Sequence, residues 1–177
     1  MSDSNSGNEN LKQEQFSAWQ KSIAALPLAT FGAGETVLQE GTKTGRLLIL
    51  KKGVVSVGKS GVEIAKVTEP GAVFGELSAL LDAPHGADVR ALESSEFHVA
   101  DAGALMREPA ALLYVATLLA RRLDLANRGL VELKSELQAG APPSLLGATL
   151  DKIEALLSAI GAGYIRAGAG MSGYPFQ

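Results

Sequence analysis

The chain has 177 residues, enough for one ordinary domain with tails, and 46% of them are hydrophobic. Its formal net charge of −3 gives no electrostatic reason to expect binding to nucleic acid or to an anionic membrane. The chain contains no cysteine, which excludes disulfides, thiolate metal sites and cysteine nucleophiles and is consistent with a reducing compartment.

Residues 1–10 are polar and rich in Ser and Asn, unlike a secretory signal, and we expect them to form a disordered lead. The longest apolar stretch, 110–120, is too short to span a bilayer. The sequence therefore predicts a cytoplasmic protein that makes no membrane contact.

An amphipathic helix is predicted over residues 11–26. Phe16, Trp19 and Ile23 follow a helical spacing, and Pro27 is placed to end the helix. Its apolar side should pack on the surface of the domain that follows.

Residues 30–100 have a different character, because glycines interrupt short apolar runs. Three of these runs, 47–50, 54–57 and 62–67, have the length and β-branched content of strands. Lys59-Ser60-Gly61 lies between two of them and is predicted to form a hairpin turn. Several short strands with closely spaced turns predict an antiparallel sandwich or roll.

Helical periodicity returns at residue 102. Asp101 suits the N-cap of a short helix, and Pro109 suits the first turn of a long one that should reach Gln138. Gly140 and the two prolines after it should end the long helix. The remaining segment, 139–177, is expected to hold a short helix at about 144–160 and a glycine-rich tail.

The long helix carries apolar residues at alternating steps of three and four: Leu112, Ala116, Leu119, Leu123, Ala126, Leu130, Leu133 and Leu137. A repeat over more than three heptads is typical of a coiled coil, although its first half could instead cover the β domain. We expect a homodimer that forms through Leu119, Leu123, Ala126, Leu130, Leu133 and Leu137. Gly129 costs about 1 kcal/mol relative to alanine inside a helix, so it should mark a bend or a close approach.

Residues 74–87 are the most informative stretch. A buried phosphodiester needs backbone N–H groups, which a small-residue turn at a helix N-terminus supplies well. Residues 74–80 look like such a helix, entered through Gly75, and the carboxylate of Glu76 could accept a hydrogen bond from a ribose hydroxyl. Gly86-Ala87 offers further donors without bulky side chains. Glu76 could also be a solvated carboxylate at the start of a helix.

The sequence here resembles the phosphate-binding cassette of the cyclic nucleotide-binding domain family. Phe74-Gly75-Glu76-Leu77 is followed by Pro84-His85-Gly86-Ala87-Asp88-Val89, and the resemblance extends over about residues 25–135. It implies a mainly β fold with helices: an antiparallel, double-stranded jelly-roll-like β-roll flanked by an N-terminal helix and a long C-terminal helix. The domain with its long helix should span residues 27–138.

The resemblance also implies a ligand site for a cyclic nucleotide, formed by Phe74, Gly75, Glu76, Leu77, Ser78, His85, Gly86 and Ala87. The family places an arginine that pairs with the cyclic phosphate where this chain has His85. A hydrogen bond to a charged group contributes about 1.5–3 kcal/mol, so binding should be weakened roughly ten- to a hundredfold. Arg90 should not replace that arginine, because odd offsets from His85 along a strand point to the opposite face.

Three interpretations of His85 stay open. The phosphate site could be abandoned, it could bind weakly and pH-dependently through an imidazolium with a reference pKa near 6.5, or it could accept a different anion. Members of the resembled family that select cyclic GMP often place Thr or Ser beside the phosphate arginine, and Gly86 has no hydroxyl, so the resemblance favours cyclic AMP over cyclic GMP.

The remaining sequence argues against other functions. Residues 141–177 contain only Lys152 and Arg166 as basic residues, so we expect no DNA-reading module. The two histidines have no metal-ligand spacing, and a cupin-type metalloenzyme is therefore disfavoured.

The predicted function is a stand-alone cyclic nucleotide-binding regulatory protein in signal transduction. We expect no enzymatic activity, no cofactor and an effector protein that the sequence does not identify. The alternative is a ligand-free dimeric interaction or scaffold module on a degenerate cyclic nucleotide-binding fold.

Overall fold

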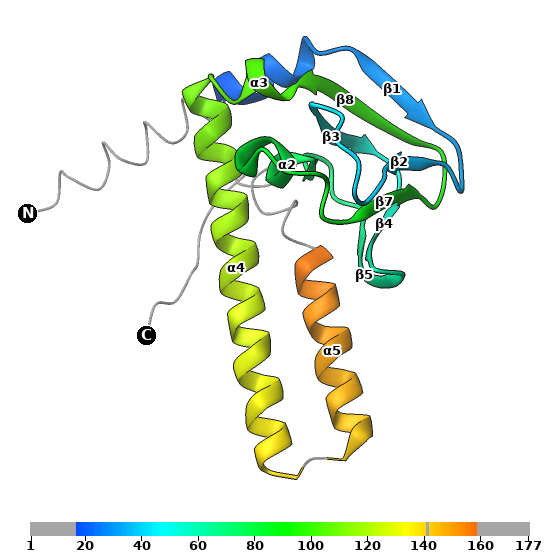
Figure 1. The fold of residues 1–177 in the computed structure, drawn as a ribbon, viewed down its shortest axis with the longest axis vertical. Helices are drawn as coiled ribbons and strands as arrows, with labels where there is room; N and C mark the ends of the chain where they lie inside the picture. The colour runs from blue at the N-terminus through cyan, green and yellow to red at the C-terminus, as the bar shows by residue number, and fades with distance from the viewer. Residues whose placement is uncertain (1–16, 141, 159–177) are drawn as a thin grey trace, which may run out of the picture.

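The computed structural model describes residues 17–140 and 142–158. A helical segment at 17–24 precedes a β-roll, and helices follow it (Figure 1). The elements are β1 (Leu28–Phe31), β2 (Thr36–Leu38), β3 (Arg46–Lys52), β4 (Val55–Lys59), β5 (Val62–Val67), β6 (Val73–Phe74), α2 (Glu76–Leu81), β7 (Asp88–Ala91), β8 (Ser95–Asp101), α3 (Ala102–Leu105), α4 (Pro109–Gln138) and α5 (Pro143–Ser158).

The strands form two four-stranded antiparallel sheets, ordered β1-β8-β3-β6 and β2-β7-β4-β5. Apolar side chains of both sheets meet in a shared core around Leu50, Val55 and Phe97, all of which are fully buried. This arrangement confirms the predicted antiparallel β-roll with a long C-terminal helix.

The β4–β5 hairpin turns where the sequence predicted it. Lys59 pairs with Val62, so the loop has two residues, Ser60 and Gly61. Their φ angles are 52° and 79°, and two positive φ values are what the type I′ turn of a two-residue hairpin requires. Glycine adopts the second without steric cost.

A second core lies on the outer face of the β1-β8-β3-β6 sheet, beneath the helices. Trp19, from the helical segment at 17–24, stacks against Tyr114 of α4 with ring centroids 5.1 Å apart. The hydroxyl of Tyr114 donates a hydrogen bond to the carbonyl oxygen of Gly71 at 2.9 Å. These contacts fix the start of α4 on the β-roll.

The helix boundaries follow local signals. The carboxylate of Asp101 accepts a hydrogen bond from the backbone N–H of Ala104 at 2.7 Å, which makes it the N-cap of α3. Gly140 has a φ of 69° after the end of α4, the left-handed conformation that commonly stops a helix. The predicted lead at 1–10, the start of the first predicted helix at 11–16 and residues 159–177 lie outside the described residues.

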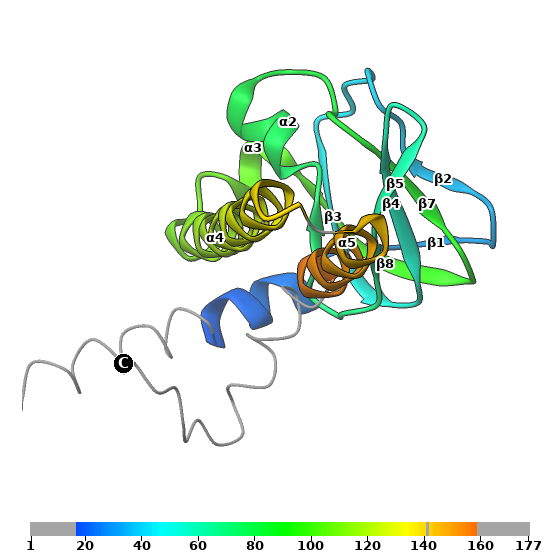
Figure 2. The ribbon, with the colours of Figure 1, turned by 90° about the horizontal axis from the view of Figure 1, so that it is seen from below.

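The last helix, α5, runs back along α4 and also packs against β5 (Figures 1 and 2). A Cβ placed on Gly129 of α4 would lie 2.5 Å from the Cδ1 of Ile153, so Gly129 marks a close approach of two helices. Thr149 donates to Glu136 at 2.7 Å, and Lys152 donates to Glu132 at 2.8 Å. Within the described residues, no helix combines the length and apolar character needed to cross a bilayer.

Candidate ligand-binding site

A pocket of about 300 Å³ lies beside α2 and β5 and reaches α4. All eight residues that the sequence predicted for the ligand site line it: Phe74, Gly75, Glu76, Leu77, Ser78, His85, Gly86 and Ala87. Its other lining residues are Leu38, Val57, Lys59, Ile64, Ala65, Val67, Val73, Val89 and Arg122. The fold therefore brings the two cassette segments to one cavity and adds an apolar wall from β4 and β5.

Gly75 sets the entry into α2. Its φ is 89°, and a Cβ there would lie 2.5 Å from the carbonyl oxygen of Arg46. Any residue other than glycine would clash with the β3 backbone and adopt a strained conformation. The tight passage holds Glu76 at the pocket.

Glu76 is buried, with 5% of its surface exposed. Its Oε1 accepts a hydrogen bond from Nη1 of Arg122 at 2.6 Å, which is also an ion pair. Burial raises the pKa of Glu76 above its usual value, while the Arg122 charge opposes that rise. Glu76 is thus a desolvated carboxylate held by one cation, unlike the solvated carboxylate considered as an alternative.

Arg122 is a charged pocket-lining residue that the sequence did not reveal. It reaches the pocket from α4, 46 residues beyond Glu76, and its Nη2 donates to the carbonyl oxygen of Val73 at 3.3 Å. Arg122 sits next to a position of the heptad repeat, and the repeat gives no reason to place its side chain in a pocket. The single hint was the pair Arg121-Arg122, which follows the apolar run at 110–120.

His85 lies in the pocket wall with 4% of its surface exposed. Its Nε2 is 2.9 Å from Oγ1 of Thr44, and its backbone is tied to residues 41 and 42 by two hydrogen bonds. Burial lowers the pKa of His85 below its ordinary value of 6.5, so the ring is neutral at pH 7. This environment disfavours the imidazolium interpretation.

Two polar side chains near the pocket, Arg90 and Ser78, donate hydrogen bonds to backbone carbonyl oxygens. Arg90 donates to the carbonyl oxygen of Gly34 at 2.7 Å and lies outside the pocket lining. The buried hydroxyl of Ser78 donates to the carbonyl oxygen of Ala83 at 2.5 Å, which shapes the loop after α2. An ion pair between Lys43 and Asp82 closes the same loop from outside.

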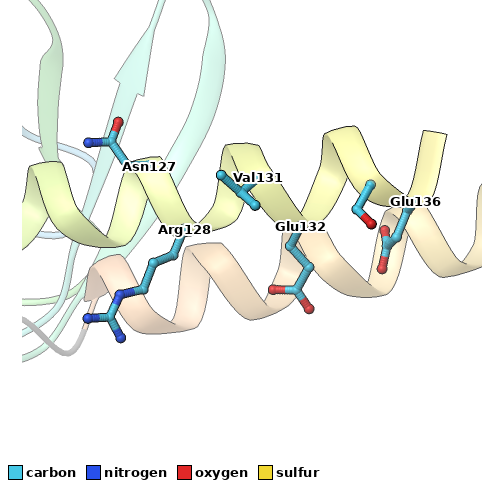
Figure 3. Close-up of a pocket in the computed structure, with 6 residues that line it drawn as sticks. Asn127, Arg128, Val131, Glu132 and Glu136 are labelled. Carbon is cyan, nitrogen blue, oxygen red and sulfur yellow. The ribbon is translucent and has the colours of Figure 1, made fainter. Parts of the chain in front are cut away.

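A second hollow runs along the surface of α4 (Figure 3). Its lining residues all belong to that helix, and none is a predicted site residue: Asn127, Arg128, Val131, Glu132, Ser135 and Glu136. Arg128 is paired with Asp124 at 2.8 Å. Within residues 17–140 and 142–158, no cluster of three or more His, Cys, Asp or Glu side chains could hold a metal ion.

Comparisons with known proteins show which domain and fold this chain resembles. The family model described as cyclic nucleotide-binding domain matches residues 28–108, which include the whole cassette. The crystal structure of Thermus thermophilus catabolite activator protein is 22% identical, covers 88% of this chain and 85% of its own, and superimposes with a TM-score of 0.55. That likeness shows the fold. No curated protein matches the sequence.

Two further solved structures are more distant. The N-terminal domain of a transcriptional regulator from Streptomyces coelicolor A3(2) is 25% identical over 62% of this chain and 81% of its own, with a TM-score of 0.48. The regulatory domain of Toxoplasma gondii PKA with cAMP is 22% identical over 52% of this chain, with a TM-score of 0.48. This chain spans only 38% of the length of that protein. Residues 28–108 of this chain thus resemble the cyclic nucleotide-binding domain family, and the β-roll that contains them has the fold of the catabolite activator protein structure.

Proposed function

We propose that this protein is a cyclic nucleotide-binding regulatory protein whose ligand occupies the pocket beside α2 and β5. One observation carries the proposal: two sequence segments, 74–78 and 85–87, line a single cavity of about 300 Å³. That volume is at the lower end of the size range of small-molecule sites.

The pocket offers a place for each part of the ligand. The Glu76 carboxylate can accept a hydrogen bond from the ribose hydroxyl, and the apolar wall from Val57, Ile64 and Val67 suits a base. Gly86 leaves room for the phosphate, because a Cβ there would meet nothing within 4 Å. Gly86 also has no side-chain hydroxyl, which by the family resemblance favours cyclic AMP over cyclic GMP.

The neutral His85 should make binding weaker than an arginine would. Because burial lowers the pKa of His85, we expect protonation of His85 to tighten cyclic AMP binding between pH 8 and pH 6 less than an ordinary histidine would. Titration calorimetry with cyclic AMP and cyclic GMP tests this, with His85→Gln as the control that separates His85 from other titrating groups. Binding that tightens at pH 6 in the native protein but not in His85→Gln would mean that an imidazolium binds the phosphate.

His85→Arg should restore the cation beside Gly86 and tighten cyclic AMP binding roughly ten- to a hundredfold. Glu76→Gln should weaken it, because a neutral amide is a poorer acceptor than a carboxylate. If the native protein binds no cyclic nucleotide, the proposal fails, whether or not His85→Arg binds one.

A second candidate function is a ligand-free dimeric interaction module. It is favoured by the neutral His85 and by the Arg122 guanidinium that already engages Glu76. Both candidates include a homodimer through α4, because Leu123, Leu130 and Leu137 are 62%, 64% and 63% exposed. A native protein that stays silent in the titration while His85→Arg binds would favour the module.

A further inference from the structure

The charges in the pocket suggest which residue meets the ligand's anion. With His85 neutral, the charged lining residues are Lys59, Glu76 and Arg122. Lys59 is an exposed residue at the end of β4, where water screens its charge. Arg122 is partly desolvated, with 29% of its side chain exposed, so its charge acts more strongly on a bound group.

Arg122 also has hydrogen-bonding capacity to spare. A guanidinium carries five N–H donors. One Nη1 donor engages Glu76 at 2.6 Å and one Nη2 donor reaches the carbonyl oxygen of Val73 at 3.3 Å. Within the described residues, the remaining three donors have no hydrogen-bond partner. The ion pair with Glu76 restrains the side chain, so little further conformational entropy is lost when it meets a ligand.

The Glu76–Arg122 pair matches the chemistry of a cyclic nucleotide. The pair places a carboxylate acceptor and a guanidinium donor side by side, 2.6 Å apart. In a 3′,5′-cyclic nucleotide the ribose 2′-hydroxyl is a donor, and the phosphate attached at the adjacent carbon is an anionic acceptor. A planar fork such as arginine suits phosphate oxygens better than a neutral imidazole does.

We propose that Arg122 binds the cyclic phosphate, so that the cation for the anion comes from helix α4 and not from the loop before β7. This inference rests on the proposed function, since it names a binding residue of the same pocket. It also means that the ligand contacts the helix that carries the exposed leucines.

The test compares two ligands, cyclic AMP and adenosine, which differ by the phosphate. Calorimetric titration gives the ratio of their dissociation constants for the native protein and for Arg122→Gln. We expect Arg122→Gln to lower the preference for cyclic AMP about ten- to a hundredfold, with a much smaller change for adenosine. Arg128→Gln is the matched control: it removes the same charge from the same helix outside this pocket and should keep the native ratio.

The outcomes separate this inference from the proposed function. If the native protein binds cyclic AMP and Arg122→Gln keeps the native ratio, the inference is wrong while the function stands. The inference is also wrong if Arg122→Gln weakens both ligands equally, because Arg122 would then only position Glu76. Absence of cyclic AMP binding by the native protein would overturn both.

A second pair of variants guards against misfolding. Arg122→Gln leaves the buried Glu76 without its cation, whereas Glu76→Gln with Arg122→Gln removes both charges together. Compared with Glu76→Gln alone, the double variant should show the same loss of preference for cyclic AMP over adenosine. An unchanged ratio between these two variants would contradict the phosphate role.

Discussion

Two faces of α4 differ in composition and in what covers them. The face toward the pocket and α5 is polar or small: Arg122 pairs with Glu76, Gly129 meets Ile153, and Glu132 pairs with Lys152. The adjacent face carries Leu123, Leu130 and Leu137, which are mostly exposed. In its second half, α4 thus packs on its own chain through its less hydrophobic face, whereas its first half packs through apolar residues such as Tyr114 and Val115.

The difference shows that hydrophobicity alone does not decide which helix face is used within a chain. A glycine allows two helix backbones to approach closely, and hydrogen-bonded polar pairs can complete such a contact. The exposed leucines in heptad spacing then remain free to pack against another molecule. A second copy of this helix is the simplest partner, because it carries the same repeat. We propose that α4 serves its own chain with one face and a second copy with the other.

Removing the cation of the polar face should have the largest effect on stability. Arg122→Gln leaves a buried, unpaired carboxylate and should cost about 2–3 kcal/mol at pH 8, less than the loss from a fully buried pair because Arg122 is partly exposed. Denaturant unfolding of the native protein and the variant measures the difference.

The pH dependence of this loss follows from the Glu76 pKa. That pKa is raised in the folded protein, so the carboxyl group favours folding at low pH, and this contribution is lost as the pH rises through the folded value. Without Arg122 the pKa should rise further, since the opposing charge is gone. The cost of Arg122→Gln should therefore shrink between pH 8 and pH 4.5, and an equal cost at both pH values would contradict the account.

The close approach at Gly129 predicts a smaller effect. Gly129→Ala and Gly147→Ala should gain the same helix propensity of about 1 kcal/mol. A Cβ at residue 129 would lie 2.5 Å from Ile153, whereas one at Gly147 would meet nothing within 4 Å. Overpacking should make Gly129→Ala about 1–3 kcal/mol less stable than Gly147→Ala in thermal or denaturant unfolding. Equal stabilities would mean that the two helices do not pack closely.

The surface ion pair between Lys152 and Glu132 should contribute least to the free energy of unfolding. Lys152→Gln removes the pair with Glu132, both partners of which are substantially exposed. Its effect on the free energy of unfolding should stay below about 1 kcal/mol and decrease with added salt. A larger loss that salt does not reduce would show that this contact, and not Gly129, holds α5 on α4.

Local signals made much of the fold predictable. The two-residue turn at Ser60-Gly61, the cap at Asp101 and the proline at the start of α4 each depend on a few neighbouring residues. The cassette residues could be identified because they form two short segments whose order is distinctive. Their convergence on one pocket follows from the β-roll that the same pattern implied.

The features that the sequence did not predict depend on contacts between residues far apart in the chain. Nothing in the sequence links Arg122 to Glu76, because a polar residue beside a heptad position is ordinary on any solvated helix. The partner of His85, Thr44, comes from a loop 41 residues earlier, so its neutral, buried environment could not be anticipated. Gly129 was recognised as a close approach or a bend, but the sequence did not identify Ile153 as its neighbour.

The division of α4 into two faces is tested most directly by sedimentation equilibrium of three proteins. The account predicts that the native protein is a dimer and that Leu123→Glu with Leu130→Glu is a folded monomer. Val131→Glu is the matched control, because Val131 is 70% exposed on the same helix but lies outside the heptad repeat, and it should remain a dimer. A native monomer, or a Val131→Glu protein that dissociates as fully as the leucine variant, would contradict the account.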